Sequence, residues 1–238
     1  MTTGAAHWVE VVKPGLQYRN QGGILVPEKM PEILGQNQKY QRFYDKIAGL
    51  YDLWEIVYAG WLHGGRDSAR HDLLKNLTVK PGDKVLEVSI GTGVNLKYLS
   101  DEAEYFGLDI SWKMLQRCRR NLSRWNRRAT LFHGIAEDLP FRDGVFDVVY
   151  HIGGVNFFQN PRQAINEMIR VAKHGGLVLY GDETEKMVRE IYEKTPVAGK
   201  YFQGEKVPSP LTWLPDGLNP DYEVILKGNF YIVSFVKP

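Results

Sequence analysis

Apolar and polar residues follow two different periods along the middle of the chain. Short apolar runs predict buried strands. Between them, apolar residues recur every three or four positions, as on the buried face of a helix. This alternation predicts a parallel sheet covered by helices on both faces. The expected strands cover 84–88, 104–109, 129–133, 145–151 and 176–181, and the expected helices cover 93–100, 111–126 and 161–173.

The segments that flank this core follow other patterns. Helical periodicity over 38–58 and 68–77 predicts two helices before the first strand. After the core, the β-prone runs Glu223–Leu226 and Phe230–Val236 surround a Gly-Asn pair, which is typical of a tight hairpin turn. We therefore expect an α/β fold with a Rossmann-like, mostly parallel sheet of seven strands that ends in a C-terminal antiparallel hairpin.

Residues 1–37 are punctuated by glycine and proline between β-prone patches at Trp8–Val12 and Ile24–Val26. A loose arm, a hairpin over the active site and a strand exchanged with a second copy all remain open. We expect this arm to precede one domain over residues 38–238. Its expected parts are a helical cap (38–80), a core (81–182) and a C-terminal helix with the hairpin (183–238).

Composition narrows the class of protein. The 238 residues include 30 Lys and Arg and 28 Asp and Glu, so net charge implies neither a nucleic-acid partner nor an acidic substrate. Cys118 is the single cysteine, which excludes an internal disulfide and a cysteine-based zinc site, and we expect no metal. Without a leader pattern or a long apolar run, we expect a soluble, cytoplasmic protein.

The stretch Val85–Gly93 is the most informative part of the chain. An apolar strand ends in an acidic residue, and glycines follow that let backbone N–H groups approach a ligand. A pyrophosphate-binding fingerprint would have a third glycine where this chain has Leu96. The next strand ends in Asp109, whose carboxylate suits the two hydroxyls of a ribose.

Two further segments complete the pattern. Ala136–Phe141 precedes the strand at 145–151, and Arg170–Gly176 ends a helix in two glycines and opens the next strand. In this order and spacing, the four segments resemble the class I S-adenosylmethionine-dependent methyltransferases. The resemblance covers about residues 40–182 and is closest to the branch of the ubiquinone and menaquinone C-methyltransferases. It implies S-adenosylmethionine as the cofactor.

The resemblance also implies which residues hold the cofactor. Glu87 would face the ammonium group, the backbone of the glycine turn the carboxylate, and Asp109 the ribose. Apolar residues would sandwich the adenine, and residues after the third strand would contact its edge. One departure is Ile135, where related sequences carry an aspartate. The expected cofactor residues are Glu87, Gly91, Thr92, Gly93, Asp109, Ile110, Met114, Ala136 and Glu137.

Residues expected near the methyl acceptor lie on the N-terminal helix and after the fourth strand. Tyr44 and Tyr51 resemble the tyrosines of the family's lid helix, and His151 is a candidate general base. Asn156 and Phe157 could orient a planar acceptor. Ordinary packing also explains the tyrosines, and a hydrogen-bonded structural histidine explains His151.

A basic stripe runs along the predicted helix at 111–126, opposite an apolar face that includes Cys118. A solvated face, contact with an anionic membrane surface and contact with RNA remain open, although the absence of a basic arm argues against nucleic acid. A homodimer also remains open. The stripe consists of Lys113, Arg117, Arg120, Arg124 and Arg127.

These observations predict an enzyme that transfers the methyl group of S-adenosylmethionine to a small-molecule or lipid-like acceptor and releases S-adenosylhomocysteine. Two alternatives stay open. A nicotinamide-dependent oxidoreductase shares the strand, glycine turn and acid, but lacks the tail hairpin. A module that binds S-adenosylmethionine without catalysis would carry the same cofactor residues.

Overall fold

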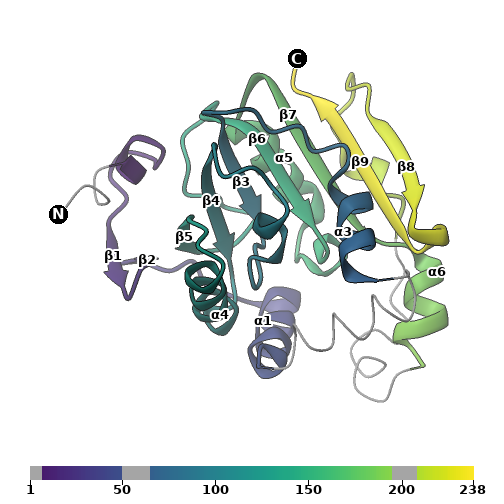
Figure 1. The fold of residues 1–238 in the computed structure, drawn as a ribbon, viewed down its shortest axis with the longest axis horizontal. Helices are drawn as coiled ribbons and strands as arrows, with labels where there is room; N and C mark the ends of the chain where they lie inside the picture. Colours follow the sequence, from purple (N-terminus) through teal and green to yellow (C-terminus); the bar gives the residue numbers. More distant parts are fainter. Residues whose placement is uncertain (1–6, 50–64, 195–207) are drawn as a thin grey trace.

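A computed structural model describes residues 7–49, 65–194 and 208–238 of the chain. Within these residues, nine strands form one sheet in the order β1-β2-β5-β4-β3-β6-β7-β9-β8 (Figure 1). Its five central strands are parallel and pair over long registers, as Val85–Glu87 of β3 do with residues 148–150 of β6. They are β3 (Lys84–Val88), β4 (Glu104–Asp109), β5 (Thr130–His133), β6 (Phe146–Ile152) and β7 (Ala172–Glu183).

The C-terminal hairpin closes one side of the sheet. Strand β9 (Phe230–Val236) pairs antiparallel with β7, and β8 (Asp221–Ile225) pairs antiparallel with β9. These two strands and the five parallel ones are the seven that the sequence predicts. The α/β fold with a C-terminal antiparallel hairpin is therefore confirmed.

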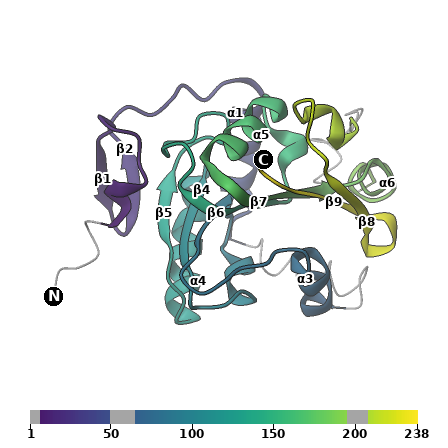
Figure 2. The ribbon, with the colours of Figure 1, turned by 90° about the horizontal axis from the view of Figure 1, so that it is seen from above.

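The other side of the sheet is longer than expected. Strands β1 (Tyr18–Gln21) and β2 (Ile24–Pro27) form a hairpin, and β2 pairs parallel to β5. The sheet therefore has nine strands instead of seven. Of the arrangements considered for the N-terminal segment, the structure shows a hairpin, but at the sheet edge (Figure 2). The patch at 8–12 forms a 3₁₀ turn, η1 (His7–Glu10), instead of a strand.

Helices cover both faces, as the alternation of patterns predicts. Helix α5 (Pro161–Val171) packs its apolar side into the core on one face of the sheet. On the other face, α3 (Arg66–Leu74) and α4 (Trp112–Arg124) share a second core cluster. The side chain of Ser111 caps α4 by accepting a hydrogen bond from Met114 N.

Two expected helices are shorter or less regular than the sequence pattern suggests. Instead of a helix at 93–100, the chain forms a 3₁₀ turn, η2 (Val94–Lys97). Three successive residues of this turn are buried, a pattern that one face of an α-helix cannot provide. In the tail, α6 (Glu185–Met187) continues as a π-helical turn over Val188–Tyr192.

Helix α1 (Gly35–Ile47) lies across the carboxyl ends of the central strands (Figure 1). Near its C-terminus, Asp45 Oδ1 accepts a hydrogen bond of 2.6 Å from the Ser111 hydroxyl. At its N-terminus, Gln36 N donates to Gln159 Oε1 over 2.7 Å. These contacts fix both ends of α1 over the sheet edge where active sites of α/β proteins form. Among the described residues, no helix has the length and apolar character to span a bilayer.

Candidate functional site

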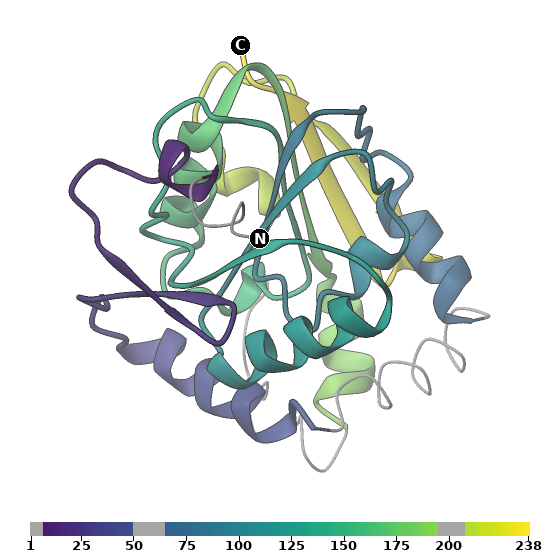
Figure 3. The ribbon, with the colours of Figure 1, turned by 60° about the vertical axis from the view of Figure 1, so that its left-hand side comes forward.

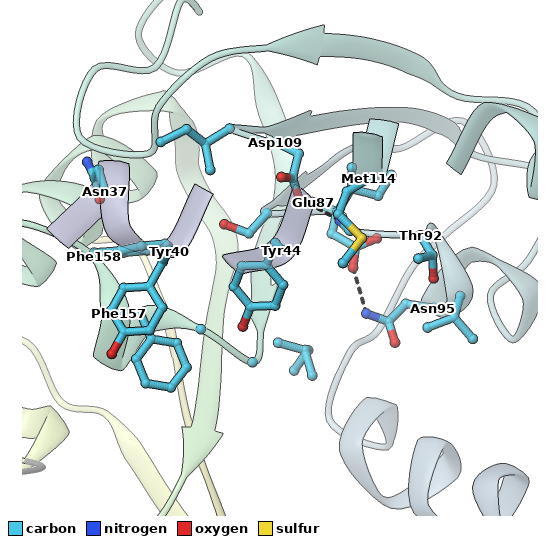
Figure 4. A pocket seen from close by; sticks show the side chains of 18 of the residues that line it. Asn37, Tyr40, Tyr44, Glu87, Thr92, Asn95, Asp109, Met114, Phe157 and Phe158 are labelled. Carbon is cyan, nitrogen blue, oxygen red and sulfur yellow. Dashed lines mark hydrogen bonds between the residues drawn. The ribbon is translucent and has the colours of Figure 1, made fainter. Parts of the chain in front are cut away.

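A pocket lies between α1 and the carboxyl ends of β3, β4 and β6 (Figure 4). Helix α1 contributes Asn37, Tyr40 and Tyr44, and α3 contributes Arg70. The hollow encloses about 740 Å³ outside the protein atoms, part of it open to solvent. Its other polar side chains come from β3, from the turns that follow β3 and from the end of β4.

The turn after β3 reverses the chain through left-handed backbone conformations. Ser89 has a φ of 57°, Gly91 of 56° and Gly93 of 77°. A Cβ on Gly91 would meet no atom within 4 Å, whereas a Cβ on Gly93 would lie 2.7 Å from the Cys118 sulfur. Gly91 therefore keeps space open at the pocket, and Gly93 allows the turn to pack closely against α4.

The backbone N–H groups of this turn are largely used within the protein. Gly91 N donates to Asp109 Oδ2 over 2.7 Å, and Gly93 N donates to Ile90 O over 2.9 Å. The glycine turn therefore does not present the open row of donors that we expected for a carboxylate. Thr92 does line the pocket, and its buried hydroxyl has no hydrogen-bond partner among the described residues. A buried hydroxyl in this state is suited to a ligand.

Glu87 is a buried carboxyl group, only 2% exposed, at the pocket floor. It accepts hydrogen bonds from Asn95 Nδ2 at 2.6 Å, drawn in Figure 4, and from the Tyr150 hydroxyl at 2.7 Å. Burial raises its pKa from 4.5 to about 7, against the opposing effect of these hydrogen bonds and of Arg70. Arg70 in turn donates to Asn95 Oδ1 over 2.8 Å.

Asp109 is the second buried carboxyl group of the pocket. Besides Gly91 N, its side chain accepts a hydrogen bond of 2.8 Å from Ser111 N. Burial raises its pKa from 3.8 to about 6, although the backbone hydrogen bonds lower it. Two desolvated carboxyl groups that ionise near neutral pH make the pocket receptive to a ligand that carries positive charge.

Aromatic side chains form the opposite wall. The Tyr40 and Phe157 rings stack with their centroids 4.5 Å apart, and Phe158 and Tyr44 also line the pocket (Figure 4). The Tyr44 hydroxyl lies 3.9 Å from the position that a Cβ on Gly154 would occupy. The glycine therefore leaves room beside the Tyr44 hydroxyl, on a wall that suits a flat ring.

The other residues expected at the acceptor have different surroundings. His151 is fully buried behind Phe158, with ring centroids 5.0 Å apart, and is absent from the pocket lining. Its Nδ1 donates to Val88 O over 2.8 Å, and burial lowers its pKa to about 4. Asn156 donates to the Glu183 carbonyl over 3.0 Å, so it secures a loop. Tyr51 lies outside the described residues.

The residues expected at the adenine edge divide into two groups. Ile110 and Met114 line the pocket. Ala136 is buried in the core, and Glu137 Oε1 accepts from Asn37 Nδ2 at 3.1 Å, so these two lie behind α1. Neither Ala136 nor Glu137 lines the pocket, whereas Asn37 does.

Sequence reasoning missed several polar groups of the site. Arg70 and Asn95 line the pocket, and Tyr150 supports Glu87 from the neighbouring strand. Arg70 belongs to an ordinary polar helix face, and Asn95 to an expected helix that does not form. Only Tyr150, a polar residue within an apolar strand run, carried a signal that it had a polar partner.

Comparison with known proteins identifies the family of the chain. Residues 86–180 match the family model described as a methyltransferase domain. The chain is 29% identical over 188 residues to a demethylmenaquinone methyltransferase of Lysinibacillus sphaericus, covering 74% of this chain and 75% of that protein. It is 30% identical over 180 residues to a demethylmenaquinone methyltransferase of Listeria monocytogenes, with 70% and 75% covered.

Solved structures show the same fold. An S-adenosylmethionine-dependent methyltransferase of Thermotoga maritima superposes with a TM-score of 0.62 at 17% identity, over 83% of this chain and 99% of that one. Another, from Aquifex aeolicus, gives 0.53 at 16% identity, over 71% and 89%. At these identities the structural similarity shows the fold, and the relatives found by sequence show the family.

Proposed function

Because this chain belongs to the class I S-adenosylmethionine-dependent methyltransferases, in the branch of the demethylmenaquinone methyltransferases, we propose that its pocket methylates a planar, lipid-like acceptor. The methyl donor is S-adenosylmethionine, whose sulfonium supplies an electrophilic methyl group. The pair of buried carboxyl groups under an aromatic wall is the observation that carries the proposal. One side of the pocket suits a cationic cofactor, and the other suits a flat apolar ring.

The polar groups of the pocket fit the cofactor in a specific order. Glu87 has the charge and burial to hold an ammonium group, and Asp109 lines the pocket where it would accept hydrogen bonds from the ribose hydroxyls. Since the glycine turn uses two of its N–H groups internally, we assign the carboxylate to Arg70, the cation that lines the same pocket. Ile110 and Met114 supply the apolar surfaces for the adenine.

The acceptor side of the pocket is aromatic with one hydroxyl. We assign the ring of the acceptor to the surface formed by Tyr40 and Phe157, and its hydroxyl group to Tyr44. A ring hydroxyl held by Tyr44 would orient the acceptor for in-line attack, and alignment is the main contribution of a protein to this displacement. The relatives named as demethylmenaquinone methyltransferases support a hydroxylated ring with an apolar tail as the acceptor class.

Incorporation of a labelled methyl group tests the proposal. The purified chain is incubated with methyl-labelled S-adenosylmethionine and one of three acceptors: a short-tailed demethylmenaquinol, a catechol or a primary amine. We expect label in the quinol. Label only in the amine or the catechol would overturn the acceptor class.

Two substitutions separate the binding of donor and acceptor in the same assay. Arg70→Gln should raise the KM for S-adenosylmethionine and leave the KM for the acceptor unchanged. Tyr44→Phe should do the reverse, because it removes one hydroxyl from the acceptor side. Equal effects of both variants on both substrates would contradict the assignment of the two sides.

A further inference from the structure

Positive charge is concentrated on two helices of this protein. Helices α1 and α4 together contain eight Lys and Arg residues and a single acid, Asp45. Because the whole chain carries a net charge of only +2, the remaining residues are net acidic. The positive charge is therefore a local property of these helices and not of the protein as a whole.

The two helices form one continuous surface. They lie side by side at the edge of the molecule in Figure 3, where α1 contacts the start of α4. The single acid does not interrupt the positive charge, because Asp45 Oδ1 accepts from the Ser111 hydroxyl and from Lys113 N. Its carboxylate is thus directed at the N-terminus of α4, where a negative charge is favourable.

The structure also shows which cations face solvent. Arg127, expected in the stripe, donates to the Leu96 and Leu99 carbonyls, and the neighbouring Arg119 donates to the Gly22 carbonyl. These two arginines therefore serve the fold. We call the exposed remainder the basic face: Arg42, Lys46, Lys113, Arg120 and Arg124.

The basic face lies next to the pocket. Helix α1 carries two of its cations outward and lines the pocket with Tyr40 and Tyr44 on another side. Immediately before α1, Leu34 is 55% exposed, a large apolar side chain on the surface beside the pocket. Cations with an exposed apolar residue suit the boundary between lipid headgroups and acyl chains.

We propose that the basic face docks this enzyme on an anionic lipid bilayer, so that a lipid-like acceptor enters the pocket from the membrane. The docking itself follows from charge and geometry, and only the identity of the acceptor rests on the proposed function. A bilayer fits better than RNA, because Leu34 favours an apolar phase and none of the five cations of the face alternates with an exposed aromatic side chain on these helices.

Vesicle co-sedimentation at low salt tests the docking. We expect the protein to pellet with vesicles of phosphatidylglycerol and phosphatidylcholine, but not with phosphatidylcholine alone, and to be released at 0.5 M salt as surface charges are screened. Each cation near an anionic surface contributes about 1 kcal/mol, which corresponds to about fivefold in partitioning. The double variant Arg120→Gln/Arg124→Gln should therefore bind at least tenfold more weakly.

A matched variant tests whether vesicle binding depends on the position of the positive charges or only on their number. Lys80→Gln/Lys227→Gln removes two exposed cations outside the basic face and should bind vesicles as the unchanged protein does. No sedimentation with anionic vesicles, or equal losses in both double variants, would overturn the proposal. Binding to an RNA duplex through Arg120 and Arg124 that is tighter than binding to anionic vesicles would also overturn the proposal and identify nucleic acid as the partner.

The two proposals fail in different ways. Methylation of a short-tailed, water-soluble acceptor requires no bilayer, so it should be equal in the unchanged protein and in both double variants. With a long-tailed acceptor embedded in anionic vesicles, only the Arg120→Gln/Arg124→Gln variant should be slower. If the unchanged protein does not methylate the soluble acceptor, the proposed function is contradicted and the docking result stays intact.

Discussion

Replacing Glu87 by glutamine removes the more buried of the two pocket carboxyl groups and keeps its shape. Glutamine can retain both hydrogen bonds of this position. Its Oε1 would accept from Asn95 Nδ2, and its Nε2 would donate to the Tyr150 hydroxyl oxygen once the hydroxyl hydrogen turns away. The substitution therefore tests the charge rather than the packing.

The size of the effect follows from the pKa of Glu87. Burial raises it from 4.5 to about 7, and a tenfold change in ionisation corresponds to about 1.4 kcal/mol, so ionised Glu87 destabilises the fold by roughly 3 kcal/mol. Because the folded-state pKa is the higher one, protonated Glu87 stabilises the folded protein. This stabilisation is complete below pH 4.5 and is lost as the pH rises through about 7. Glu87→Gln escapes this loss.

Urea denaturation at pH 5 and at pH 8 measures the effect. The gain in free energy of unfolding from Glu87→Gln should be about 2–3 kcal/mol larger at pH 8 than at pH 5. Glu10→Gln, a change at an exposed glutamate, is the control and should give the same small difference at both values of pH. If the stability difference between Glu87→Gln and the unchanged protein did not depend on pH, Glu87 would not ionise as the structure indicates.

The same carboxyl group links cofactor binding to protons. Cationic groups of S-adenosylmethionine favour the ionised form of Glu87, so binding should release protons below pH 7, and affinity should rise with pH until Glu87 is ionised in the free protein. Calorimetry in two buffers of different ionisation enthalpy measures this release. An affinity that is constant from pH 6 to pH 8 would contradict the role of Glu87.

Three further predictions concern single residues. Asp109→Ala should weaken S-adenosylmethionine binding by about 1–3 kcal/mol, or about 5- to 150-fold in calorimetry, and unchanged affinity would remove Asp109 from the site. His151→Asn keeps a donor for the Val88 carbonyl, so kcat should stay within about threefold, whereas a loss of a hundredfold or more would restore His151 as a general base. Gly91→Ala and Gly93→Ala share a left-handed backbone strain of about 1 kcal/mol. Gly93→Ala should be less stable in urea by a further 1–3 kcal/mol, because only its Cβ meets the Cys118 sulfur, and equal losses would refute this contact.

A strand could be predicted from the sequence where the pattern of its own residues is enough to define it. The runs at 84–88 and 104–109 are apolar at their centres, and the structure has β3 and β4 at these bounds. The hairpin β1–β2 was harder to place, because its position depends on pairing between Ile24 and Leu131. No local pattern in either segment announces such a pairing. The 3₁₀ turn at Val94–Lys97 was predicted as a helix because its apolar residues follow a helical spacing. Its three successive buried residues are covered by neighbouring elements, which the local sequence does not reveal.

The same distinction applies to the site. The carboxyl groups of Glu87 and Asp109 could be predicted, since each ends or nearly ends a strand, and a glycine turn follows the strand of Glu87. Arg70 could not, because its place in the pocket results from the way α3 packs on the sheet. Tertiary packing likewise placed His151 behind Phe158, although its position at the end of the predicted strand suggested a general base.

The N-terminal hairpin has a consequence for the order of folding. Ile24 and Leu25 of β2 leave the ribosome well before β5, their partner strand, which is synthesised about a hundred residues later. Closing so long a loop is slow, and until then this apolar strand has one edge open to pairing with other chains. Strands β1 and β2 are therefore placed late, and folding should depend on keeping them apart from other nascent chains until β5 has formed.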